Sequence, residues 1–93
     1  MLGIAEGIET ALAASMLFSM PVWSTISTTL MGSWTPPEGV SEVCIFADRD
    51  AEYAGQAAAY TLAHRLSRKV KVVVRLPDAP GDWADVVHKR IAS

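Results

Sequence analysis

Two aspartates separated by one residue are the first feature of the sequence that could do chemistry. Asp48 and Asp50 follow directly on the apolar run Val43–Phe46, with Arg49 between them. Because residues i and i+2 of an extended segment point to the same side, the two carboxylates can converge on one point. Two carboxylates at such a short distance repel each other unless a cation lies between them. The pair therefore predicts a site for a hard divalent ion, Mg²⁺ or Mn²⁺, while Arg49 on the opposite side braces the site or faces solvent.

Further acids stand where two other helices are expected to begin. Glu6 and Glu9 follow the first apolar run of the sequence, and Asp82 and Asp85 follow the last one. Acids favour helix N-termini, so capping is an alternative function for each of them, as it is for Asp48. Capping alone does not explain why three separate helix starts, each after an expected strand, are all acidic.

The elements that must position these acids alternate along the sequence. β-Branched and apolar runs predict strands at residues 2–5, 22–26, 43–47 and 70–76, and helical spacing predicts helices at residues 8–18, 52–68 and 83–91. Residues 27–41, rich in Gly and Pro, are predicted to be mostly loop. A parallel crossover needs a helix to return the chain, so we expect an α/β fold with a four-stranded, mostly parallel, Rossmann-like sheet and helices on both faces. Ligands of such sheets bind beyond the carboxyl ends of the strands, where the acids stand.

Composition limits the class of protein. A chain of 93 residues with 51% hydrophobic and 19% charged residues predicts one folded domain. The single Cys44 can build neither a disulfide framework nor a zinc site, and we expect it in the core of a cytoplasmic protein. The apolar stretch at residues 11–23 is interrupted by Pro21 and is too short to span a membrane.

Charge is distributed unevenly along the sequence. The net charge is −2, yet no Lys or Arg precedes Arg49, and five of them crowd between residues 65 and 75. The simpler interpretation of this basic segment is a solvated helix end followed by a strand with charged flanks. The alternative is contact with phosphate or nucleic acid, for which Arg49, Arg65 and Lys69 are the candidates.

Four segments in this order resemble the Toprim domain, which is shared by primases, topoisomerases and related nucleases. They are IAEGIETALAA, PVWSTIST, IFADRDAEYAGQAAA and PGDWADVV. The resemblance covers nearly the whole chain, so we expect residues 1–93 to be one Toprim domain cut from a longer, primase-type protein. The segments are most similar to those of phage and plasmid primase–helicase proteins.

The resemblance implies a role for each acid. Glu6 matches the family's invariant glutamate, a general base when strands are joined and a general acid when they are cut. Asp48 and Asp50 match the metal-binding aspartates. Asp82 matches an acid that helps to hold a second ion in the primase branch, and Asp85 is an additional candidate.

The sequence departs from better-known primases at Thr10. Many of those proteins have an acid at this position, four residues after the glutamate. Glu9, at the neighbouring position, is the further candidate for that role.

The function implied by the resemblance is metal-dependent nucleotidyl transfer for primer synthesis in DNA replication. Its cofactor is Mg²⁺ or Mn²⁺, and its partners are single-stranded DNA template, nucleotides and other domains of the parent protein, a helicase among them, with no membrane. We expect the isolated domain to be inactive because a template-binding region is missing. Two alternatives stay open, a Toprim nuclease and a non-catalytic module that binds metal or DNA or docks to a partner. Phosphatases and receiver domains that use strand-end aspartates are disfavoured, because here the D-x-D pattern follows the third strand.

Overall fold

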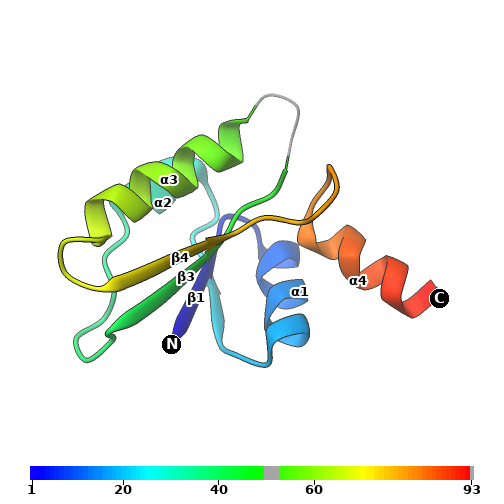
Figure 1. Cartoon of the computed structure of the whole chain (residues 1–93), viewed down its shortest axis with the longest axis horizontal. Coiled ribbons are helices and arrows are strands. Elements are labelled where there is room, and N and C mark those ends of the chain that lie inside the picture. Colours follow the sequence, from blue (N-terminus) through cyan, green and yellow to red (C-terminus); the bar gives the residue numbers. More distant parts are fainter. Residues whose placement is uncertain (50–52, 93) are drawn as a thin grey trace.

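A four-stranded, all-parallel sheet with strand order β2-β1-β3-β4 forms the centre of the computed structural model, which describes residues 1–49 and 53–92 (Figure 1). The strands are β1 (Leu2–Ala5), β2 (Val22–Ser24), β3 (Glu42–Phe46) and β4 (Lys71–Arg75). The predicted α/β fold is confirmed, with every described strand pair parallel. β2 ends two residues earlier than predicted because Ile26 adopts a left-handed φ of 75°, which an extended strand cannot accommodate.

Helices cover both faces of this sheet. They are α1 (Ile8–Phe18), α2 (Thr28–Ser33), α3 (Ala54–Leu66) and α4 (Trp83–Ala92). α1 packs with α4 on one face, and α2 packs with α3 on the other (Figure 1). In the part of the chain that the structure describes, no helix has the length and apolar character needed to cross a membrane.

The short helix α2 was not predicted, because its segment is rich in Gly and Pro. Two local features stabilise it. The Ser27 hydroxyl accepts a hydrogen bond from the Leu30 N–H at 3.1 Å, which caps the first turn. Met31 is only 2% exposed and anchors the helix in the core beneath α3.

Strand β3 divides the core into two halves. Val43 and Ile45 pack toward α2 and α3, whereas Cys44 and Phe46 pack toward α1 and α4. Because both faces of a parallel sheet are buried, the strand is apolar from Val43 to Phe46 and does not alternate. Cys44 is fully buried, as predicted, and burial raises the pKa of its thiol while the charge of nearby Arg75 opposes the rise.

α1 buries a different face from the one that its large apolar residues suggest. Ile8, Leu12 and Met16 are 63%, 61% and 66% exposed. The buried side chains of this helix are small, namely Thr10, Ala11, Ala13 and Ala14. They allow α1 to lie close to the sheet and to α4, and this close packing places the Thr10 hydroxyl at the strand ends.

Candidate active site

Three predicted acids gather at the carboxyl edge of the sheet. Ala5 of β1 is paired with Phe46 of β3, so Glu6 and Asp48 leave the sheet from neighbouring strands. Asp82 reaches the same edge from the turn between β4 and α4. The negative charges of Asp82 and Glu6 both act on the Asp48 carboxyl group and raise its pKa. The structure therefore brings these three residues together.

Glu6 is held in place through its backbone. Its carbonyl oxygen accepts hydrogen bonds from the Ser24 hydroxyl at 2.8 Å and from the Ile26 N–H at 2.6 Å. Both donors belong to the end of β2 and the turn that follows. This anchoring fixes where the Glu6 side chain leaves the sheet, and the residue is half-buried there.

Asp48 is the most constrained of the three acids. Its two carboxylate oxygens lie 3.2 and 3.3 Å from Thr10 Oγ1, and the Trp83 N–H donates to one of them at 3.3 Å. Burial is the largest influence on this carboxyl group and raises its pKa, the two hydrogen bonds lower it, and the neighbouring acids raise it further. A negative charge at Asp48 is therefore costly, and a bound cation would relieve that cost.

The contact of Thr10 with Asp48 is not among the features predicted from the sequence, in which Thr10 stands out only as a departure from primases. Thr10 is 5% exposed, and its side chain faces the site from the first turns of α1. The sequence carries no local signal for this contact, because it joins residues 38 positions apart.

Asp82 and Asp85 form a reciprocal cap at the start of α4. The Asp85 N–H donates to Asp82 Oδ1 at 2.8 Å, and the Asp82 N–H donates to Asp85 Oδ2 at 3.1 Å. The predicted N-cap at Asp82 is confirmed. Asp85 is exposed and its carboxylate is turned to this cap, whereas Asp82 both caps the helix and contributes its charge to the Asp48 environment.

Glu9 lies at the rim of the same region. With Thr10, Ile26 and Asp82 it lines a hollow of about 360 Å³. Ile26 is 71% exposed and keeps its left-handed backbone although it is β-branched, a conformation that costs about 1–3 kcal/mol. Such strain beside a group of acids is typical of a functional site.

The three predicted phosphate contacts lie in different places. Arg49 braces the turn before α4: its backbone pairs with Gly81 through two hydrogen bonds of 2.8 Å, and its Nη1 donates to the Asp78 carbonyl at 2.7 Å. Arg65 donates to the carbonyl oxygens of Gly32, at 3.1 Å, and Trp34.

Arg65 and Lys69 lie near the end of α3 and in the turn that leads into β4. This end of α3 is at the amino edge of the sheet, opposite the acids. The structure therefore does not bring these two cations to the acidic site, and their contact with phosphate stays a prediction.

The chemistry of the described donors fits a hard divalent ion. Within residues 1–49 and 53–92, no group of three or more Asp, Glu, His or Cys side chains is arranged to hold a metal ion. Mg²⁺ is commonly bound through one or two carboxylates and several waters, so Asp48 with Asp82 or Glu6 is a sufficient protein contribution. Asp50, the other predicted metal ligand, lies outside the described residues.

Comparison with known proteins agrees with the architecture of this site. A family model described as Toprim domain matches residues 1–92. No curated protein and no solved structure matches the chain. Toprim domains occur in enzymes that act on nucleic acids, by nucleotidyl transfer or as nucleases, and typically bind Mg²⁺ or Mn²⁺. Every described strand and helix lies inside the matched region, and the chain belongs to the Toprim domain family.

Proposed function

We propose that this Toprim domain catalyses metal-dependent nucleotidyl transfer for primer synthesis in DNA replication, within a phage or plasmid protein of the primase–helicase type. The observation that carries the proposal is the half-buried Asp48 carboxylate, whose pKa is raised by burial and by the charges of Asp82 and Glu6. A cluster of this kind suits a site that receives a divalent cation. The likeness of its four motif segments to primase–helicase proteins supports the choice of reaction.

The acids would divide the chemistry between them. Asp48 and Asp82, together with Asp50, would hold Mg²⁺ or Mn²⁺. The ion, when bound, neutralises phosphate oxygens and stabilises the charge of the transition state. Glu6, clamped at its backbone, would accept the proton of the attacking hydroxyl as general base.

The partners of this reaction would be a single-stranded DNA template, nucleotides and the other domains of the parent protein, with a helicase among them. A reduced, cytoplasmic setting is consistent with the buried free thiol of Cys44.

A second candidate is a non-catalytic Toprim module. It is favoured by the reciprocal cap of Asp82 and Asp85, because that cap gives both acids a purely structural function. A Toprim nuclease would use the same acids, with Glu6 as general acid toward the leaving hydroxyl.

Calorimetric titration with Mn²⁺ tests the metal site first. We expect saturable binding by the wild-type domain and none by Asp48→Asn. Glu38→Gln is the matched control, because Glu38 is an exposed acid in the loop before β3, at the amino edge of the sheet. Equal binding by wild type and Asp48→Asn would refute the metal site.

Primer synthesis by the parent protein then tests the reaction. Glu6→Gln should retain Mn²⁺ binding and lose primer extension. If the parent protein cleaves DNA and does not extend primers, and Glu6→Gln loses that cleavage, the domain is a nuclease. Mn²⁺ binding with neither activity would support the non-catalytic module.

A further inference from the structure

A second hollow, of about 810 Å³, lies between β4 and α4, beside the acidic site. One wall is the face of β4 that carries Val73 and Arg75, and the other is the inner side of α4 with Val86 and Lys89. Phe18 also lines the hollow. We refer to this hollow as the β4–α4 groove.

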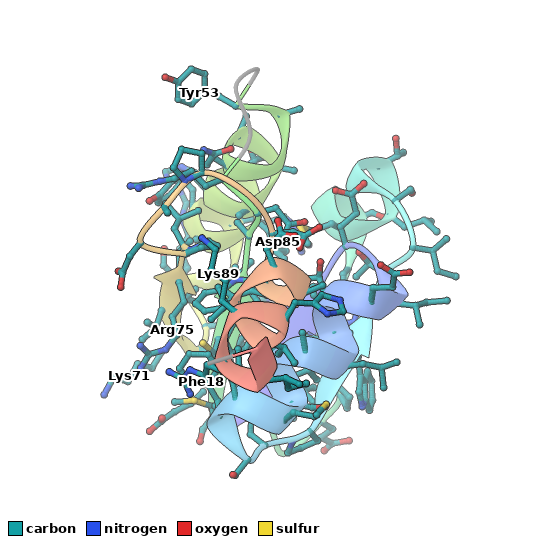
Figure 2. All side chains as sticks on the ribbon, turned by 90° about the vertical axis from the view of Figure 1, so that its right-hand side faces the viewer. Phe18, Tyr53, Lys71, Arg75, Asp85 and Lys89 are labelled. Atoms are coloured by element: carbon teal, nitrogen blue, oxygen red, sulfur yellow. The ribbon has the colours of Figure 1, made fainter. Side chains whose placement is uncertain are left out.

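The β4–α4 groove is basic in a chain whose net charge is negative. Its charged lining residues are Arg75, Lys89, Arg90 and a single acid, Asp78. Lys71 extends the basic surface along the same strand, because residues 71, 73 and 75 point to one face of β4. Figure 2 shows Lys71, Arg75 and Lys89 on one side of the molecule.

The Arg75 guanidinium is held ready for an anion by aromatic packing. Its Cζ lies 5.0 Å from the centre of the Phe18 ring. Phe18 in turn packs against Phe46 and Trp83, with ring centres 5.0 and 5.4 Å apart. This stack and the neighbouring Cys44 thiol hold Arg75 in position, and the residue stays exposed, so a ligand can approach it.

Trp83 connects the groove to the acids. Its ring lines the groove, its ring N–H donates to the Ala47 carbonyl at 3.1 Å, and its backbone N–H donates to Asp48 at 3.3 Å. A ligand that follows the groove toward this residue therefore arrives beside the carboxylate cluster.

We propose that the β4–α4 groove binds single-stranded nucleic acid, with phosphates at Arg75 and Lys89, and leads the strand to the acidic site. The proposal rests on the proposed function, because it takes that strand to be the substrate. The lining favours nucleic acid, because cations that can bind phosphates lie beside apolar side chains and the aromatic Phe18 and Trp83, against which bases can pack. An acidic peptide would use the cations but would leave the apolar wall without a partner.

Fluorescence anisotropy with labelled oligothymidylate, in EDTA and at low salt, tests the groove independently of metal. We expect Arg75→Gln and Lys89→Gln each to weaken binding by about two- to fivefold, as the loss of one exposed ion pair would. Each should also lower the slope of log K against log salt concentration by about 0.7. Lys69→Gln is the matched control, because it removes the same charge at the opposite edge of the sheet and should bind like wild type.

Several outcomes would overturn this proposal. One is binding by Lys89→Gln at wild-type strength, another is equal weakening by Lys69→Gln, and a third is absence of wild-type binding. Competition by polyglutamate as effective as that by unlabelled oligothymidylate would assign the groove to acidic peptides. Lys89 is exposed, so its variant should fold and remain informative even if Arg75→Gln does not.

The same experiment separates the groove from the proposed function. Asp48→Asn should bind the oligonucleotide in EDTA at least as well as wild type does, because it removes a nearby negative charge. Equal Mn²⁺ binding by wild type and Asp48→Asn, together with weakened oligonucleotide binding by the groove variants, would refute the metal site alone. Intact Mn²⁺ binding with unaffected groove variants would refute the groove alone.

Discussion

Thr10 Oγ1 lies 3.2 and 3.3 Å from the two carboxylate oxygens of Asp48, and so links α1 to the end of β3 across 38 positions of the sequence. The hydroxyl is buried on the small-residue face of α1, and the hydrogen bond it donates lowers the pKa of Asp48 against the effect of burial. Thr10 therefore acts as a positioning residue, which orients the carboxylate and favours its charged form.

Replacing Thr10 by Val should raise the pKa of Asp48 further, because the shape is kept and the hydroxyl donor is lost. The pKa can be followed by NMR titration of the Asp48 carboxyl carbon. We also expect a loss of about 1 kcal/mol of stability. Thr10→Ser retains the hydroxyl and should keep the wild-type pKa. If the pKa of Asp48 were unchanged in Thr10→Val, the Thr10 hydroxyl would not stabilise the charged form of Asp48.

Asp48 should make stability depend on pH in an unusual direction for an acid. Its pKa is higher in the folded state than in the unfolded state, so the folded state binds the proton more tightly. Its contribution to stability therefore falls as pH rises from the unfolded pKa through the folded one. At neutral pH in EDTA, Asp48→Asn should be more stable than wild type, by less than about 1 kcal/mol.

Thermal unfolding of both proteins over a range of pH measures this difference. Asn keeps an acceptor oxygen for the Trp83 N–H, so the comparison isolates the charge. Added Mn²⁺ should raise the melting temperature of wild type and leave that of Asp48→Asn unchanged. If Asp48→Asn were less stable than wild type at neutral pH in EDTA, this would contradict a raised pKa of Asp48 in the folded state.

Local sequence patterns were enough to predict the sheet and the edge at which the acids stand. Each strand is a continuous apolar or β-branched run, and the sequence of strands and helices leaves a parallel sheet as the simple solution. Glu6, Asp48 and Asp82 follow strand ends, so their convergence is a consequence of that topology.

Features that depend on packing could not be predicted in this way. The stripe of Ile8, Leu12 and Met16 marks α1 as a helix, but the alanine face is the one that approaches the sheet, because small side chains allow the closest contact. The contact of Thr10 with Asp48 joins distant positions of the sequence and has no local signal. Helix α2 depends on the burial of Met31, which composition alone does not reveal.

Asp82 can be tested for its two functions separately, because serine caps helices about as well as aspartate does. Asp82→Ser should keep the hydrogen bond from the Asp85 N–H and remain as stable as wild type, but bind Mn²⁺ more weakly. Asp82→Ala should lose about 1 kcal/mol of stability in urea unfolding, because it removes the cap as well. Undiminished Mn²⁺ binding by Asp82→Ser would leave Asp82 with a capping function alone.

Gly81 should tolerate no side chain, although it makes no chemical contribution to the site. Its φ of 131° is disfavoured for other residues, and a Cβ atom would lie 2.6 Å from Asp85 Oδ2. Gly81→Ala should therefore cost about 1–3 kcal/mol of stability in urea unfolding. Because Gly81 also pairs with Arg49, the substitution should displace the capping acids and weaken Mn²⁺ binding.

The matched control for Gly81 is Gly32→Ala in helix α2. A Cβ atom there meets nothing within 4 Å, and its backbone is not left-handed. Alanine is the better helix former, so this variant should gain about 0.5–1 kcal/mol of stability. The two substitutions should change the free energy of unfolding in opposite directions. In α2 the added methyl group reduces the backbone freedom that is lost on folding, whereas at the start of α4 it forces the acids apart. If Gly81→Ala were as stable as Gly32→Ala, the turn before α4 could not be the rigid support that holds Asp82 beside Asp48.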